Sequence, residues 1–158
     1  MHAARSRTLV LAGVALVALL TAGLSAAGGA PRAVVVRDAA GDVVAREALS
    51  PPGDFALAYR HSYYGAPARE VFRAGRAGFA LRALASPSAA VLDYYALAGA
   101  RTRSGGWVRL ELRDRRRYRR LTLIATSTGR RTLVVGKRRV PLYGAGARHL
   151  TLTVEGGS

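Results

Sequence analysis

The chain has 158 residues, a length typical of one domain, and its lack of cysteine excludes disulfide bonds, thiolate metal sites and thiol nucleophiles. Its formal net charge at pH 7 is +16, and Lys137 is the single lysine among 25 basic residues, so arginine carries almost all of the positive charge. Such a balance is typical either of an anion-binding protein or of the arginine-rich composition that a GC-rich genome encodes.

The N-terminal residues predict export from the cytoplasm. Arg5 and Arg7 precede an apolar segment, residues 8–30, that contains no charged residue. Small side chains at Ser25 to Ala27 suit a signal peptidase, which predicts a cleaved signal peptide over residues 1–27. The alternative is an uncleaved membrane anchor over residues 8–30, because about 20 apolar residues can span a bilayer.

Both alternatives place the remainder, residues 28–158, outside the cytoplasm as a single exported domain. The end of an apolar segment that carries arginine stays on the cytoplasmic side, so the C-terminal part is periplasmic, extracellular or anchored on the outer side of the cytoplasmic membrane. This location disfavours nucleic acid as a partner in spite of the positive charge.

The first predicted elements form a hairpin. The β-branched runs Ala33–Arg37 and Val43–Glu47 flank the sequence Asp-Ala-Ala-Gly-Asp, which favours a tight reversal of the chain. A loop over residues 50–53 follows, because Ser-Pro-Pro-Gly is typical of loops.

The next segment predicts a second hairpin. Apolar side chains alternate along its first strand, which is the period of a half-buried strand, and the alternation ends in an imidazole: Phe55, Leu57, Tyr59 and His61. After a break at Gly65 and Pro67 the alternation resumes in a returning strand, at Glu70, Phe72 and Ala74.

Symmetric closure of the loop Tyr64–Pro67 would oppose Tyr59 to Phe72, His61 to Glu70 and Leu57 to Ala74. Opposed side chains lie about 4.5–5.5 Å apart at Cβ, so we expect His61 and Glu70 to lie within hydrogen-bonding reach. The pair would line a ligand pocket together with Tyr59 and Ser62. The alternative is a purely structural pair at the edge of the core.

The rest of the chain predicts further short strands. We expect a strand at Phe79–Ala85, a short helix over residues 87–98, a loop at Ala100–Gly106, and strands at Trp107–Leu112, Tyr118–Ile124, Thr132–Val135, Val140–Leu142 and Leu150–Glu155. The helix competes with the strand propensity of its Val-Leu-Asp-Tyr-Tyr run. His149 should face solvent with Thr151 and Thr153. The fold class is therefore mainly β, an antiparallel sandwich or barrel of about 8–10 short strands.

The second hairpin resembles the leading motif of a small family of exported bacterial proteins classed as a domain of unknown function. The likeness extends from Val34 to Glu155 and is carried by Tyr59, His61, Ser62, Gly65, Pro67 and Glu70. Genes of that family often lie near tripartite transporters of the TRAP/TAXI type, so the resemblance implies an extracytoplasmic location and membrane transporter components as partners. It implies no activity. The segment Ala85–Leu97 departs from the Gly-rich stretch of many members.

A hydrolase is an alternative, with Ser62 as nucleophile, His61 as base and Glu70 or Asp93 to orient the base. Neighbouring residues of a strand point to opposite faces, so His61 does not readily reach the Ser62 hydroxyl. The chain also lacks a Gly-x-Ser-x-Gly motif. Beyond residue 30 only His61 and His149 offer imidazole ligands, so we expect no metal, no cofactor and no catalytic residue.

Basic residues gather at the predicted turns. One group comprises Arg113, Arg115, Arg116 and Arg117, and another comprises Lys137, Arg138 and Arg139. In an antiparallel meander alternate turns share an end, so we expect these groups to converge on one rim and Arg130 and Arg131 to lie at the other. Such a patch would bind anionic lipid or a cell-wall polymer. The alternative is a set of solvated turns.

These observations predict a non-catalytic, exported accessory or binding domain that serves a membrane transporter. Two alternatives stay open. One is an envelope-associated basic domain that binds polyanions or anionic lipid through arginine-rich turns, and the other is the hydrolase that uses His61 and Ser62.

Overall fold

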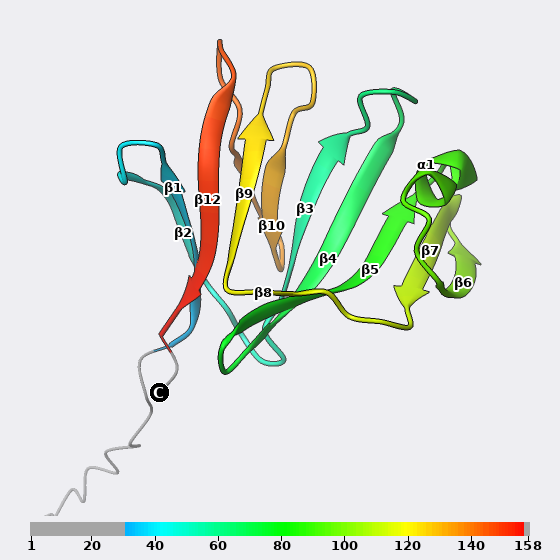
Figure 1. The fold of residues 1–158 in the computed structure, drawn as a ribbon, viewed down its shortest axis with the longest axis horizontal. Helices are drawn as coiled ribbons and strands as arrows, with labels where there is room; N and C mark the ends of the chain where they lie inside the picture. The colour runs from blue at the N-terminus through cyan, green and yellow to red at the C-terminus, as the bar shows by residue number, and fades with distance from the viewer. Residues whose placement is uncertain (1–30, 157–158) are drawn as a thin grey trace, which may run out of the picture.

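The computed structural model describes residues 31–156, so the predicted signal peptide or anchor lies outside the described residues. The expected fold class, mainly β with antiparallel sheets and one short helix, is confirmed. Two sheets face one another in a sandwich-like arrangement, with the helix beside the larger sheet (Figure 1). Within residues 31–156 no helix is long and apolar enough to cross a membrane.

The smaller sheet, sheet A, has the strand order β2 (Val43–Ala48), β1 (Ala33–Asp38), β12 (Arg148–Glu155) and β9 (Arg120–Ala125). The larger sheet, sheet B, has the order β11 (Arg138–Pro141), β10 (Thr132–Val135), β3 (Asp54–Arg60), β4 (Pro67–Gly75), β5 (Gly78–Ser86), β7 (Trp107–Leu112) and β6 (Gly99–Ser104). The short strand β8 (Arg117–Tyr118) pairs with the beginning of β5, and the helix α1 spans Ala89–Tyr94.

The core lies between the sheets and follows the alternation of the strands. The rings of Phe55 and Phe72 stack at 5.2 Å, and each meets Phe79 edge-on at 5.5 and 5.6 Å. Sheet A contributes Val34 and Leu152, which are fully buried. Burial of a large apolar side chain stabilises a fold by about 1.5–3 kcal/mol, so these alternating faces hold the sheets together.

The described residues contain β6 and β8 in addition to the expected strands. Residues 100–106 were expected to form a loop, but most of them belong to β6, which pairs with β7 from Gly99 to Ser104. Every residue of β6 is exposed, so the strand has no apolar alternation that the sequence could display. The expected strand at residues 118–124 is divided, because the chain crosses from β8 in sheet B to β9 in sheet A.

The hairpin of β3 and β4 has a different register from the expected one. Leu57 pairs with Glu70 rather than with Ala74, a displacement of four residues, and Tyr59 pairs with Ala68. The loop His61–Ala66 closes through the His61 N–H, which donates to the Ala66 carbonyl oxygen at 2.8 Å. The predicted apposition of His61 and Glu70 is therefore wrong. The displacement is even, so the core-facing and outward-facing residues are nevertheless those that the alternation predicts.

Gly78 is required where β8 approaches β5. Its φ is +118°, and a Cβ atom there would overlap the carbonyl oxygen of Tyr118. We expect Gly78→Ala to lower the free energy of unfolding by about 3 kcal/mol or more, because backbone strain adds to the displacement of β8. Urea denaturation measures the loss.

Gly41→Ala is the matched control. Gly41 also has a positive φ, +93°, but nothing lies within 4 Å of the added Cβ, so strain alone should cost about 1 kcal/mol. Equal losses in the two variants would contradict the close approach of β8.

Candidate functional site

The face of sheet B that points away from the core has a floor of small side chains between longer ones. One row across the strands reads Thr132, Ala58, Arg69, Ala85, Arg109 and Thr102. Ala85 is buried although it lies on this outer face, because the stems of its long neighbours cover it. Alternation of small and large side chains therefore hollows the sheet surface.

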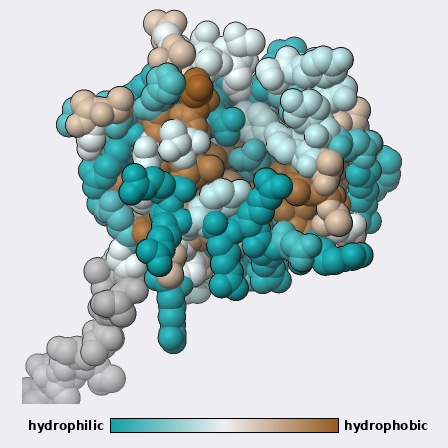
Figure 2. Space-filling view, viewed as in Figure 1, coloured by the Kyte–Doolittle hydropathy of each residue, from teal (hydrophilic) through white to brown (hydrophobic). Residues whose placement is uncertain are grey.

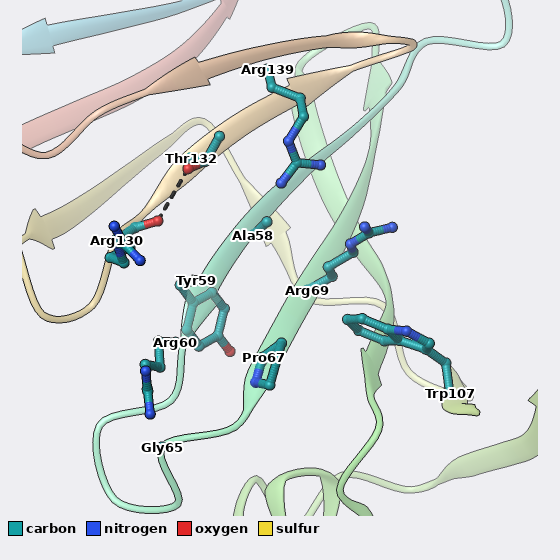
Figure 3. Close-up of a pocket in the computed structure, with 11 residues that line it drawn as sticks. Ala58, Tyr59, Arg60, Gly65, Pro67, Arg69, Trp107, Arg130, Thr132 and Arg139 are labelled. Carbon is teal, nitrogen blue, oxygen red and sulfur yellow. Dashed lines mark hydrogen bonds between the residues drawn. The ribbon is translucent and has the colours of Figure 1, made fainter. Parts of the chain in front are cut away.

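A cleft of about 470 Å³ lies at the β10–β3–β4 side of this face (Figure 3). Figure 3 shows Arg69, Arg130 and Arg139 arranged around Ala58, with Trp107 beside Arg69. The cleft is lined by Ala58, Tyr59, Arg60, Gly65, Pro67, Ala68, Arg69, Trp107, Arg130, Thr132 and Arg139.

Four arginines reach the cleft from separate elements: Arg60 ends β3, Arg69 lies in β4, Arg130 lies between β9 and β10, and Arg139 lies in β11. Within residues 31–156, no carboxylate oxygen lies within 4.0 Å of any of these guanidinium groups. Elsewhere on the domain, arginines such as Arg73 and Arg138 are paired with carboxylates at 2.6 Å. The cleft thus concentrates positive charge that the described residues do not neutralise.

Hydrogen bonds in the β9–β10 loop position Arg130. The Arg130 N–H donates to the Thr126 carbonyl oxygen at 3.0 Å, and the Gly129 N–H donates to Thr126 Oγ1 at 3.0 Å. The Gly129 carbonyl in turn accepts from the Arg60 N–H at 2.7 Å. Arg130 has a φ of +49°, in the left-handed region that arginine seldom adopts, so the surrounding hydrogen bonds hold it in place.

Trp107 holds a second cleft arginine. The guanidinium carbon of Arg69 lies 5.0 Å from the centre of the Trp107 ring, a cation–π distance. This contact restricts the Arg69 side chain without neutralising its charge. Arg69 is therefore both oriented and available to an anion.

The predicted site residues Tyr59 and Glu70 meet in a buried polar cluster on the opposite face of sheet B. The hydroxyls of Tyr59 and Tyr95 share a hydrogen bond. Arg131 Nη1 lies 3.8 Å from Glu70 Oε2, and the Arg131 guanidinium carbon lies 4.7 Å from the centre of the Tyr59 ring. Two consecutive arginines thus lie on opposite sides of the sheet. Arg130 lines the cleft, and Arg131 belongs to the buried cluster.

Burial controls the protonation of this cluster. It raises the pKa of the Glu70 carboxyl, while the charge of Arg131 and a hydrogen bond from Tyr59 act in the opposite direction. Burial also raises the pKa of the Tyr59 phenol, and the nearby charge of Glu70 raises it further. Tyr59 therefore stays protonated and can donate its hydroxyl hydrogen.

His61 and Ser62 lie in the β3–β4 loop and do not act together in this structure. His61 is buried, its Nδ1 accepts a long hydrogen bond from the Tyr64 N–H at 3.4 Å, and its ring lies 5.9 Å from that of Tyr95. Ser62 is exposed, and among the described residues no hydrogen bond joins it to His61. Tyr95 contacts the His61 ring and shares a hydrogen bond with Tyr59, whereas no hydrogen bond among the described residues joins His61 to Glu70. In the described part of the chain no three potential metal ligands converge.

The predicted basic patch is divided between two places. Arg115 and Arg117 line a separate cleft of about 410 Å³ with Arg73, Arg76 and Arg82, whereas Arg139 lines the same cleft as Arg130. The expected convergence of the 113–117 and 137–139 groups, opposite Arg130, is therefore wrong. The reason is topological, because β9 leaves for sheet A and the chain does not form a simple meander.

The sequence pattern did not identify Arg60, Arg69 and Trp107 as site residues. Alternation already placed Arg60 on the outer face, but a single arginine within a strand is a weaker signal than a run of arginines at a turn. His149 is exposed, as the alternation of its strand predicted.

Comparisons of the chain with protein-family models, with curated proteins and with solved structures found no match. The resemblance to an exported family of unknown function, and the transporter link that it implies, therefore stay predictions.

Glu70→Gln should change the pH dependence of stability. The pKa of Glu70 is raised in the folded state, so this carboxyl stabilises the fold when protonated, and that contribution is lost as the pH rises through the raised pKa. The unfolding free energy of the variant should therefore improve relative to that of the parent as the pH rises above the ordinary pKa of a glutamate.

Glu155→Gln is the control with the opposite sign. A hydrogen bond from Arg37, together with the Arg46 guanidinium, lowers the pKa of Glu155, so its contribution is present at neutral pH and is lost as the pH falls. The free energy of unfolding of this variant should decrease relative to that of the parent as the pH rises. If the unfolding free energies of the two variants, each relative to the parent, changed with pH in the same direction, the assigned environment of Glu70 would be contradicted.

Proposed function

We propose that this domain is a non-catalytic binding protein that takes up an anionic ligand in the cleft of Arg60, Arg69, Arg130 and Arg139. One observation carries the proposal. Guanidinium groups from separate elements line one hollow, and no carboxylate of residues 31–156 lies within ion-pair distance of them. Among the alternatives that the sequence leaves open, this geometry favours polyanion binding.

Like charges held together destabilise a fold through repulsion unless a counter-charge joins them. Here they are held by rigid strands, by a cation–π contact at Arg69 and by the hydrogen-bonded loop at Arg130. Guanidinium groups offer planar, bidentate donors that match carboxylate, sulfate and phosphate oxygens. An arrangement that is unfavourable alone and preorganised for an anion supports a binding role.

The volume of the cleft supports a ligand group of modest size. Binding pockets for small molecules usually measure about 300–1,000 Å³, and this cleft holds about 470 Å³. It is therefore large enough for one charged group with its attached ring or chain. A longer polymer would extend beyond it.

Export and an accessory role beside a membrane transporter belong to the same proposal. They rest on residues 1–27 or 8–30 and on the family resemblance of the β3–β4 hairpin. A soluble anionic compound, anionic lipid or an anionic cell-wall polymer would each be accessible to a domain outside the cytoplasm. The hydrolase alternative has less support, because Ser62 is exposed and unconnected to His61.

The double substitution Arg69→Ser with Arg139→Ser should weaken binding to inorganic polyphosphate. Each arginine that contacts the polyanion releases about one counterion. The negative slope of log K against log salt concentration should therefore become shallower by about 2. Isothermal titration calorimetry at several salt concentrations measures both effects. Thermal stability should change little, because exposed charges contribute only about 0–1 kcal/mol each.

Arg103→Ser with Arg113→Ser is the matched control, since it removes the same charge at exposed arginines that do not line the cleft. This variant should keep most of the affinity of the parent. Equal losses in the two double variants would show that polyphosphate responds to net charge alone, and the cleft would lose its assigned role.

A further inference from the structure

A second hollow adjoins the arginine cleft on the same face of sheet B. This hollow measures about 250 Å³, and it shares Arg69 and Trp107 with the cleft. It extends to β6, where Thr102 and Ser104 line it. Because Arg69 and Trp107 line both hollows, the hollows adjoin, and together they follow a line across the strands that we call the furrow. A furrow of this form suits a linear ligand rather than a compact one.

An exposed group of aromatic rings stands at the loop end of the furrow. Tyr63, Tyr64 and Tyr94 are 78%, 41% and 61% exposed. Their rings contact each other, with centroids 4.9 Å apart for Tyr63 and Tyr64 and 6.5 Å apart for Tyr63 and Tyr94. Figure 2 shows a pale, weakly hydrophilic group of atoms at the upper right, where Figure 1 places this loop and α1.

The tyrosine group adjoins the cleft through one loop. The loop His61–Ala66 that carries Tyr63 and Tyr64 also contributes Gly65 to the wall of the cleft. Trp107 adds an aromatic face inside the furrow, and the hydroxyls of Thr102, Ser104 and Thr132 can both donate and accept hydrogen bonds. The surface therefore combines cations, ring faces and hydroxyls.

We propose that this furrow binds a linear anionic polysaccharide, with the arginines on its acidic groups and the aromatic residues on the apolar faces of its sugar rings. The inference rests on the proposed function and names the class of ligand. Aromatic rings present a large apolar face with a polar edge, which suits a sugar ring that is apolar on its faces and polar at its rim.

The same observations favour a polysaccharide over a lipid surface. Segments that insert into a membrane interface carry Trp, Phe or Leu side chains that reach the acyl chains. In residues 31–156 the exposed large apolar side chains are Val43 and Ile124 on sheet A and the three tyrosines. The loop end of the furrow thus presents tyrosine rings with hydroxyl groups and, among the described residues, no large exposed aliphatic side chain that could insert into a membrane.

The test compares three probes on the purified chain: a sulfated heparin oligosaccharide, inorganic polyphosphate and vesicles with anionic phospholipid. Tyr63→Ala with Tyr94→Ala removes exposed rings, so the fold should survive. We expect about three- to tenfold weaker binding of the oligosaccharide and unchanged binding of polyphosphate. Trp107→Ala should act in the same direction, with circular dichroism as the check that this variant is folded.

Each outcome decides the inference. Unchanged oligosaccharide affinity in the tyrosine variant, or an equal loss for polyphosphate, would overturn the stacking role. Binding to vesicles in preference to the oligosaccharide would identify a membrane surface instead. These results leave the anion site in place as long as Arg69→Ser with Arg139→Ser weakens polyphosphate binding. Loss of that effect would overturn the proposed function itself.

Discussion

The two-residue period of β3 is the constraint on which both the core and the candidate site depend. Its inward side chains, Phe55 and Leu57, pack between the sheets, while Ala56 and Ala58 form the floor of the outer face. Because β3 pairs with β4 on one side and β10 on the other, this alternation is transmitted across the sheet. The packing that stabilises the fold therefore also sets the position of the cleft residues.

The buried cluster and the cleft are connected through one short loop. A buried carboxylate such as Glu70 is unfavourable because it loses water, and Arg131 and Tyr59 offset part of that cost. Because Arg131 is held on the core-facing side of sheet B, the preceding residue, Arg130, is constrained to the outer face. A structural ion pair on one face thus helps to place a candidate ligand-binding cation on the other.

The distribution of charge says more about function than the amount of charge. A composition rich in arginine explains why so many guanidinium groups exist, and several of them are used in ion pairs such as Arg73 with Asp54 and Arg109 with Glu111. Composition does not explain why the cleft arginines stand together apart from the carboxylates. That convergence, with an indole beside it and exposed tyrosines at its end, is what supports a binding surface.

Periodicity by itself determined the fold class, most strand positions, the short helix and the outward direction of His149. These depend on local alternation and turn residues, which a linear sequence displays. Only the tertiary structure decided the pairing of Leu57 with Glu70, because any even displacement of β4 keeps the same residues on the core face. The same holds for the exposed strand β6, which depends on backbone pairing with β7. It holds also for the cleft, whose Arg69 and Arg139 are far apart in the chain and meet because β10 and β11 continue the sheet beside β3.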